Sequence, residues 1–444
     1  MNKSITKKLS VLGYAVSCSF LMASSSYAEN LLQIYTMAYE TDPVLKQVVS
    51  DRQSIGEGEV QAFARFLPQV DAYAETVAVN NDAAGRPSNS YNRHNYSFDL
   101  NQSIFDNRNY VNYRIANLNI SQADANLSAA QQDLIIRTAN AYFGVLSAID
   151  TVGFSKAERK AISRQLDQAK RRYEVGIIAI TDVHEAQAGY DSANASVISA
   201  ENELLIAKEN LRELTGQYID EVTMLAEKIP LDPPAPAKIQ HWVDQALVGN
   251  YTLLAVTDQA AAQKENIELR RSDHYPTLGL TASYGYGKSN SSNDFNQISP
   301  QSHDRSIGVN ISIPIYEGNA IVSRTRQAQY DYQTSMDRHD EIRNSTVKNT
   351  RSSYLNVISE VSRVKALKQA VVSNISALKA TEAGFEVGTR TIVDVLNVQS
   401  ELYRAKQEYS NSRYIYILNT LRLKEASGEL ARIDLETVNG WLMK

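Results

Sequence analysis

The chain repeats one segment, and this repeat limits how it can fold. Residues 173–183 read YEVGIIAITDV, and residues 385–395 read FEVGTRTIVDV. An offset of about 212 residues is far longer than the roughly 20–50 residues of a solenoid unit, so it marks duplicated halves. Two further pairs of segments keep nearly the same offset: 104–106 with 315–317, and 212–216 with 424–428. The chain is therefore expected to fold as two copies of one layout.

The first 28 residues have the layout of a secretory signal. Three lysines precede an apolar run at 9–22, and Ala28 completes a site that a signal peptidase reads. We expect a signal peptide at 1–28. Lipoprotein-type processing at Cys18, the single cysteine, is an alternative, although the usual Leu three residues earlier is missing. No later run approaches the ~20 apolar residues of a membrane-spanning helix.

The composition excludes several classes of function. The formal net charge is −5, with 45 basic and 50 acidic residues. A mildly acidic chain without a basic block argues against nucleic acid or an anionic membrane surface as the partner. The six histidines show no metal-ligand spacing, and neither a phosphate loop nor a nucleophile elbow occurs. We expect no enzyme activity, no catalytic residue, no metal and no cofactor.

Each half contains a segment that predicts a very long helix. Residues 107–172 and 317–384 contain no proline, and a continuous helix of that length would reach on the order of 100 Å. Each is followed by a tip, 173–182 or 385–394, and then by a return helix. The return helices, 183–216 and 395–428, carry apolar or small residues at alternating spacings of three and four, which is typical of coiled coils. A soluble antiparallel coiled coil fits these helices almost as well.

Four shorter segments alternate like β-strands. They lie at about 67–79, 95–104, 276–286 and 306–315, with apolar side chains on one face and small or polar ones on the other. Transmembrane strands show this pattern, and a half-buried soluble sheet shows it too. Four strands cannot close a barrel, so in a membrane several chains must share one. Two, three or four copies are all consistent with the strand numbers of known barrels.

The remaining segments connect and close the two repeats. The first repeat is expected at 29–216 and the second at 239–428, each with a short helix before its strands. Residues 217–238 contain four prolines and predict an extended linker. Residues 429–444 lack heptads and are expected to pack around the equatorial region.

Signal, duplicated hairpins, long helices and glycine tips together resemble the TolC family of outer-membrane efflux and secretion ducts. Residues 387–396, VGTRTIVDVL, carry the most specific part of this resemblance. It implies an α+β membrane protein: a homotrimer whose twelve strands form a barrel in outer-membrane lipid, continuous with a periplasmic α-helical barrel. It also implies a passive duct whose periplasmic gate opens on a periplasmic adaptor (membrane fusion) protein. An inner-membrane pump of RND, ABC or MFS type would then supply the cargo.

The resemblance also implies roles for residues at the tips. Arg390 resembles the arginine that holds neighbouring hairpins shut, with Thr181 and Asp182 as its acceptors. Such a pair suits a latch, because charge-assisted hydrogen bonds are strong but reversible. Asp394 resembles a pore-constricting aspartate, and a ring of carboxylates favours cations. Without the family, these charges would be interpreted as solvated helix ends.

The adaptor is expected to dock at the tips, on Val175, Gly176, Val387 and Gly388. Glycines at these places also suit ordinary helix ends, where a left-handed residue is common.

Two residues depart from the family pattern. A tyrosine that helps hold the tip closed is Phe385 here, so one hydroxyl hydrogen bond is absent. A second pore carboxylate is Asn397, which removes three charges from a trimer. We therefore expect a weaker latch and a weaker cation ring.

Other classes of function explain less of the chain. A periplasmic coiled-coil adaptor or an adhesin-like stalk accounts for the helices and leaves the strands unassigned. A secreted helical protein explains still less. Drugs and secreted proteins are both consistent with the sequence as cargo.

Overall fold

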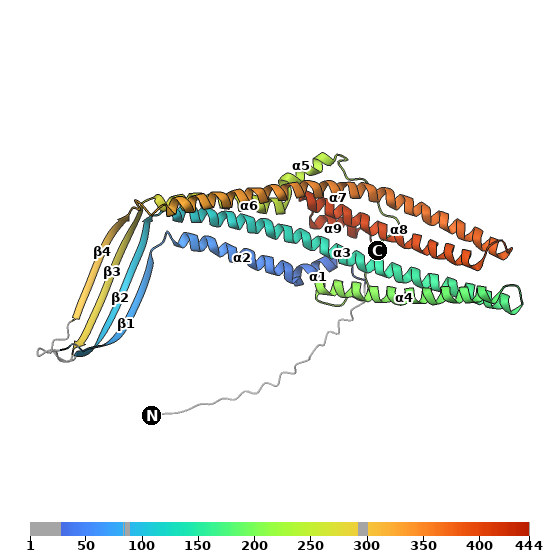
Figure 1. Cartoon of the computed structure of the whole chain (residues 1–444), viewed down its shortest axis with the longest axis horizontal. Coiled ribbons are helices and arrows are strands. Elements are labelled where there is room, and N and C mark those ends of the chain that lie inside the picture. The colour runs from blue at the N-terminus through green and yellow to red at the C-terminus, as the bar shows by residue number, and fades with distance from the viewer. Residues whose placement is uncertain (1–27, 83, 85–88, 292–300, 444) are drawn as a thin grey trace, which may run out of the picture.

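The computed structural model describes residues 28–82, 84, 89–291 and 301–443. The molecule is elongated, with a small sheet at one end and the ends of two helical hairpins at the other (Figure 1). The predicted signal peptide, except Ala28, lies outside the described residues, and so does Cys18. Within the described ranges, no helix is both long and apolar enough to cross a bilayer.

One antiparallel sheet joins the two halves. Its strands, in spatial as well as chain order, are β1 Gln69–Asn81, β2 Asn89–Phe105, β3 Thr277–Ser291 and β4 Gln301–Ser312. The halves meet where β2 pairs with β3, so β1 and β4 form the two edges of the sheet. An open edge has unpaired backbone groups, which in a membrane must be satisfied by another chain.

The observed strands differ from the sequence pattern at their ends. All four extend further towards the loops than the alternation predicted, because the backbones of Asn and Ser can pair as well as those of apolar residues. The fourth ends at Ser312 and not at 315. Pro314 lacks an N–H group and cannot continue a ladder.

Two helical hairpins run away from the sheet. The long helices are α3 Asn107–Glu174 and α7 Ala320–Glu386, of 68 and 67 residues, and each spans about 100 Å. The return helices are α4 Ile180–Thr215 and α8 Ile392–Ser427, of 36 residues each. Every heptad position that the sequence singled out on α4 and α8 is buried or half-buried. The heptads therefore form the packing seams of the hairpins.

Shorter helices complete each long rod. They are α1 Leu31–Thr41, α2 Pro43–Ala64, α5 Ile239–Gly249, α6 Tyr251–Arg271 and the 3-10 turn η1 Ser272–His274. α2 and α4 lie end to end beside α3, as α6 and α8 lie beside α7 (Figure 1). Thr41 Oγ1 donates to the carbonyl of Leu214 at 2.9 Å, and Asn250 Nδ2 donates to that of Ala426 at 3.2 Å. These bonds join matching ends of the two rods.

The main hydrophobic core lies midway along the molecule, where α1, α9 (Arg432–Asn439) and the segment 217–238 pack on the long helices. We call this region the waist. Leu31, Tyr142, Ile417 and Leu435 are fully buried there. The segment 217–238 is extended and contributes its own core residues, so it ties the halves together as well as connecting them.

Candidate functional site

The two hairpin ends share one turn geometry. α3 ends at Val175–Gly176, and the Gly176 N–H donates to the carbonyl of Tyr173 at 2.8 Å. Gly388 repeats this turn after α7, and its N–H donates to Phe385 at 3.2 Å. The φ angles of the glycines are +76° and +81°, and a Cβ at either would meet nothing within 4 Å. The backbone conformation, and not crowding, requires glycine at both turns.

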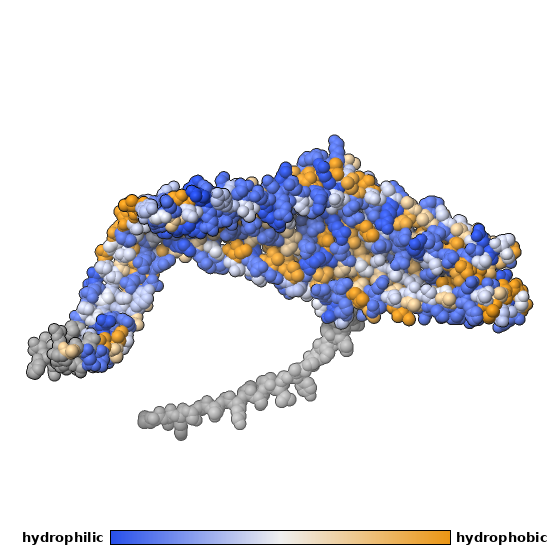
Figure 2. Space-filling view, viewed as in Figure 1, coloured by the Kyte–Doolittle hydropathy of each residue, from blue (hydrophilic) through white to orange (hydrophobic). Residues whose placement is uncertain are grey.

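Apolar side chains stand out from these turns. Val175, Ile177 and Val387 are 70%, 66% and 76% exposed. We call these residues, with the two turn glycines, the tip surface. Orange residues lie among polar ones at this end of the molecule in Figure 2. Exposed apolar residues gathered at one place are typical of a surface that meets a partner.

Just behind the tip surface, the two hairpins pack on each other through an apolar cluster. Its buried members are Ile162, Leu166, Ala169, Ala186, Ala193, Phe385, Ile392, Val395 and Leu396. They come from α3, α4, α7 and α8, so this tip cluster fixes one hairpin against the other. A Cβ on Gly189 would lie 3.4 Å from Leu396 Cδ1, an ordinary van der Waals contact, so α4 packs directly against Leu396 of α8 at this point.

Phe385 is the aromatic member of the tip cluster and is 8% exposed. The guanidinium carbon of Arg172, at the end of α3, lies 4.8 Å from the centre of its ring. A cation over an aromatic face is attracted by the ring quadrupole. Phe385 thus contacts the other hairpin through its ring, and no sequence pattern predicted Arg172 as its partner.

Asp394 forms a capping box at the start of α8. Its N–H donates to Thr391 Oγ1 at 3.2 Å, and its Oδ2 accepts from Thr391 N at 2.9 Å and from Thr391 Oγ1 at 3.0 Å. The hydrogen bond from the Thr391 backbone N–H is the largest cause that lowers the pKa of Asp394 below its usual value, and the bond from the Thr391 hydroxyl lowers it further. The charge of Arg390 adds to this effect. Asn397 lies one helical turn further on and is exposed.

Asp182 occupies the matching place on α4 but forms no capping box. The N-cap of α4 is Ala179, which has no side chain to accept a hydrogen bond. Among the described residues, Asp182 has no side-chain hydrogen bond and no ion pair, and the same holds for Thr181 and Arg390. The structure of one chain therefore does not bring Arg390 together with Thr181 or Asp182. The latch between neighbouring chains stays a prediction.

Arg390 folds back over the last turn of α7. A Cβ on Gly384 would lie 2.8 Å from Arg390 Cγ, so the absence of a side chain at 384 leaves space for the arginine. Gly384 is not among the site residues that the sequence predicted.

Polar contacts continue along the seam between α3 and α8 towards the waist. Ser400 Oγ donates to Glu158 at 2.6 Å, and the Tyr414 hydroxyl donates to Asp150 at 2.7 Å. Burial raises the pKa of the Glu158 carboxyl, although Ser400 partly opposes this. The hairpins thus contact each other through hydrogen bonds along this seam and through the apolar tip cluster nearer the tips.

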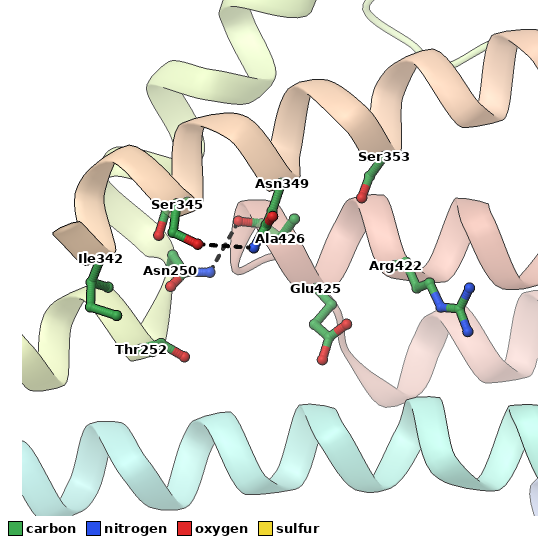
Figure 3. A pocket seen from close by; sticks show the side chains of 10 residues that line it. Asn250, Thr252, Ile342, Ser345, Asn349, Ser353, Arg422, Glu425 and Ala426 are labelled. Atoms are coloured by element: carbon green, nitrogen blue, oxygen red, sulfur yellow. Dashed lines mark hydrogen bonds between the residues drawn. The ribbon is translucent and has the colours of Figure 1, made fainter.

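A second polar site lies at the waist, where α6, α7 and α8 surround a cavity of about 350 Å³ (Figure 3). Asn250, Asn349 and Glu425 are among its lining residues. Burial and the nearby charge of Asp133 raise the pKa of Glu425 to about 7, while Arg422 opposes them. Glu213, the matching residue of the first half, is exposed. The sequence missed this site, because its elements meet only in the folded chain.

The described residues contain no group of three His, Cys, Asp or Glu side chains placed to hold a metal ion.

An open sheet with an apolar face, joined to helical hairpins about 100 Å long, defines one class of protein. The chain is one subunit of an outer-membrane duct. It belongs to the Outer membrane efflux protein family, which it matches over residues 34–217 and 242–429.

Individual relatives agree with this family. The chain is 38% identical to the outer membrane protein TolC of Vibrio cholerae, over 95% of both chains. It is 38% identical to the TolC of Escherichia coli, over 95% of this chain and 87% of that protein. The solved structure of the Campylobacter jejuni CmeC outer membrane channel has a TM-score of 0.78 at 15% identity, covering 99% of this chain and 98% of that one.

These findings confirm the predicted family, fold class, channel function and outer-membrane location. The protomer supplies a duplicated β-hairpin and long coiled-coil helices to a trimer, in which a 12-stranded outer-membrane β-barrel continues into a periplasmic α-helical barrel. The alternative of an adaptor or adhesin stalk is wrong, since both halves of the chain match the outer membrane efflux family.

Proposed function

We propose that the protein is the passive outer-membrane duct of a tripartite efflux or type I secretion system, with its gate at the hairpin tips. A periplasmic adaptor engages the tips and an inner-membrane pump of RND, ABC or MFS type delivers the cargo. The observation that carries this proposal is the pair of matching tips, whose turns expose Val175, Ile177 and Val387. The duct needs no cofactor.

The tip surface is where the adaptor docks in this proposal. Val175→Asp and Val387→Asp would place charges in the contact and abolish export, measured as resistance to dyes, detergents or antibiotics and as secreted protein, while trimers still form. Val248→Asp is the matched control, because Val248 is 74% exposed on α5 at the waist, away from the tips. Equal loss of export in all three variants would exclude a specific role for the tips.

In the closed gate, Arg390 of one protomer binds Thr181 and Asp182 of the next. Support comes from the absence of any side-chain partner for Arg390 or Asp182 in the described part of the chain. Both side chains lie near the tip surface, so each is available to a neighbour. A bond between arginine and a carboxylate is strong enough to hold and still yields to rearrangement.

Asp394 lines the narrowest part of the closed pore in the same proposal. Its capping box fixes the carboxylate in one orientation. Three such carboxylates around an axis attract cations. Asn397, one turn away, contributes no charge, so the ring depends on Asp394 alone.

Drug efflux and protein secretion differ in the cargo that passes through the duct. Deletion of the protein should be followed by toxicity profiling and, in the same strain, by analysis of the secreted proteins. Loss of resistance with an unchanged set of secreted proteins would assign efflux, and the reverse would assign type I secretion. Unchanged results in both assays would contradict the proposed duct.

A further inference from the structure

The strand register separates charge by sign between the two faces of the sheet. Residues paired across antiparallel strands share a face, and neighbours along a strand alternate. One face carries large apolar residues, including Phe98, Ile307, Val309 and Ile311, which are 56% to 78% exposed in the single chain. We call it the apolar face. In a barrel it faces lipid.

Every carboxylate in the described strands lies on the opposite face. They are Asp71, Glu75, Asp99 and Asp304. Most of their neighbours there are small or polar, although Tyr73 lies between Asp71 and Glu75. Ser97 Oγ donates to Asp99 at 2.9 Å. The side of the sheet visible in Figure 2 is mostly blue to white. In the barrel this face lines the lumen.

The basic side chains follow the reverse pattern. His94, Lys288, His303 and Arg305 all lie on the apolar face, and only Arg93 lies on the other. The register places them in adjoining rows, where His94 pairs with Lys288, and His303 and Arg305 sit opposite Tyr286 and Tyr284. We call these four residues the basic row. It lies at the loop end of the strands, away from the helices.

Aromatic rings lie against side chains of the basic row. The guanidinium carbon of Arg305 lies 5.6 Å from the Tyr284 ring centre, and the His303 ring lies 5.0 Å from that of Tyr286. Tyr96 stacks on Tyr286 at 6.2 Å. Tyrosines of this kind mark the level of the lipid headgroups in membrane proteins. The helices occupy the periplasmic side, so this level is the outer surface of the membrane.

The basic row has no counter-charge in the described part of the protein. Neither Lys288 nor Arg305 forms an ion pair there, and the apolar face of the described strands carries no carboxylate. A cation at the headgroup level, without an acidic neighbour, attracts anionic headgroups. Arginine also presents a fork of donors that matches phosphate oxygens.

We propose that the basic row is a binding surface for the phosphate groups of the glycolipid in the outer leaflet. Lys288 and Arg305 hold the phosphates, the tyrosines contact the base of the headgroup, and the acyl chains lie along the apolar residues below. A trimer has three such surfaces around its barrel. The proposal requires only the outer-membrane fold, and so its test is independent of the gate and of the cargo.

The test measures lipid binding to the full-length trimer in mixed micelles, with fluorescently labelled, bisphosphorylated lipid A as the probe. Lys288→Gln with Arg305→Gln should weaken the apparent affinity roughly fivefold for each cation removed. The matched control is Arg93→Gln, which removes a cation from the same level of the sheet but from its other face. Its affinity should equal that of the unmodified protein.

Two further arms separate phosphate recognition from other causes. Lys288→Arg with Arg305→Lys preserves the charges and should retain binding, while dephosphorylated lipid A should bind weakly to all variants. If the double Gln variant fails to form trimers, the two single variants are measured. Unchanged affinity on removal of both cations, or equal binding of dephosphorylated lipid, would overturn the proposal. Equally tight binding of phosphatidylglycerol would overturn the assignment to the glycolipid.

Discussion

At the scale of single residues, the contact between Phe385 and Arg172 replaces a hydroxyl hydrogen bond with a ring contact. Arg172→Gln removes the cation and keeps most of the side-chain length. Because a partly buried cation–π contact contributes about 0.5–2 kcal/mol, the closed tip should open more often. Single-channel recordings in planar bilayers should therefore show raised mean conductance. Phe385→Tyr keeps the ring and adds the hydroxyl of the family pattern, so it should not raise the conductance. An unchanged conductance in Arg172→Gln would rule out a latch at this contact.

Arg390 and Asp182 give a second prediction at the same scale. Arg390→Ala and Asp182→Ala should each raise the single-channel conductance, because either change removes one side of the proposed bond between protomers. The double variant should resemble the single ones, since the two residues act on one contact. Glu213→Ala is a control, as this carboxylate is exposed on α4 far from the tip. Additive effects of the two changes would indicate that the residues do not bind each other.

At the scale of elements, α8 begins with a capping box and α4 does not. Asp394 therefore has two roles that can be separated: it completes the capping box of α8, and it carries a negative charge. Thr391→Ala removes the cap hydroxyl and should cost α8 about 1 kcal/mol while leaving the carboxylate in place. Asp394→Ala keeps the bond from the backbone N–H of residue 394 to the Thr391 hydroxyl, and removes the carboxylate half of the capping box together with the charge. Only Asp394→Ala should abolish cation selectivity, measured as the reversal potential across a salt gradient. Equal shifts in both variants would mean that the order of the first turn, and not the charge, sets selectivity.

The same scale shows what sequence patterns can predict. Heptads on α4 and α8 predicted the seams, and alternation predicted the strands, because both periods are local properties of the chain. Glycine positions predicted the tip turns for the same reason. Contacts between the halves, such as Arg172 with Phe385, depend on how the hairpins pack and leave no periodic trace. The net charge of the chain also gives no indication of the basic row, because the carboxylates on the opposite face of the sheet offset its positive charges.

At the scale of the whole molecule, the waist holds two carboxylates that respond to pH in opposite directions. Asp42 is buried, which disfavours its charge, but hydrogen bonds from Arg137 at 2.7 and 3.1 Å and from Leu45 outweigh this and lower its pKa. Its contribution to stability is present above the ordinary pKa of aspartate and is lost as the pH falls through the lowered value. Arg137 also binds Asp133 at 2.6 Å, and Asp133 acts on Glu425.

Glu425 provides the last prediction. Its pKa is raised to about 7 from 4.5, so the folded state binds a proton that the unfolded state releases. Its stabilising effect is complete below pH 4.5 and disappears as the pH rises through about 7. The thermal midpoint of the trimer should therefore fall between about pH 4.5 and 7, by an amount equivalent to at most ~3 kcal/mol, and level off above that range. Glu425→Gln should remove this slope and raise the midpoint at pH 8, whereas Glu213→Gln at the matching exposed position should keep it. A slope that persists in Glu425→Gln would assign the pH dependence to another group.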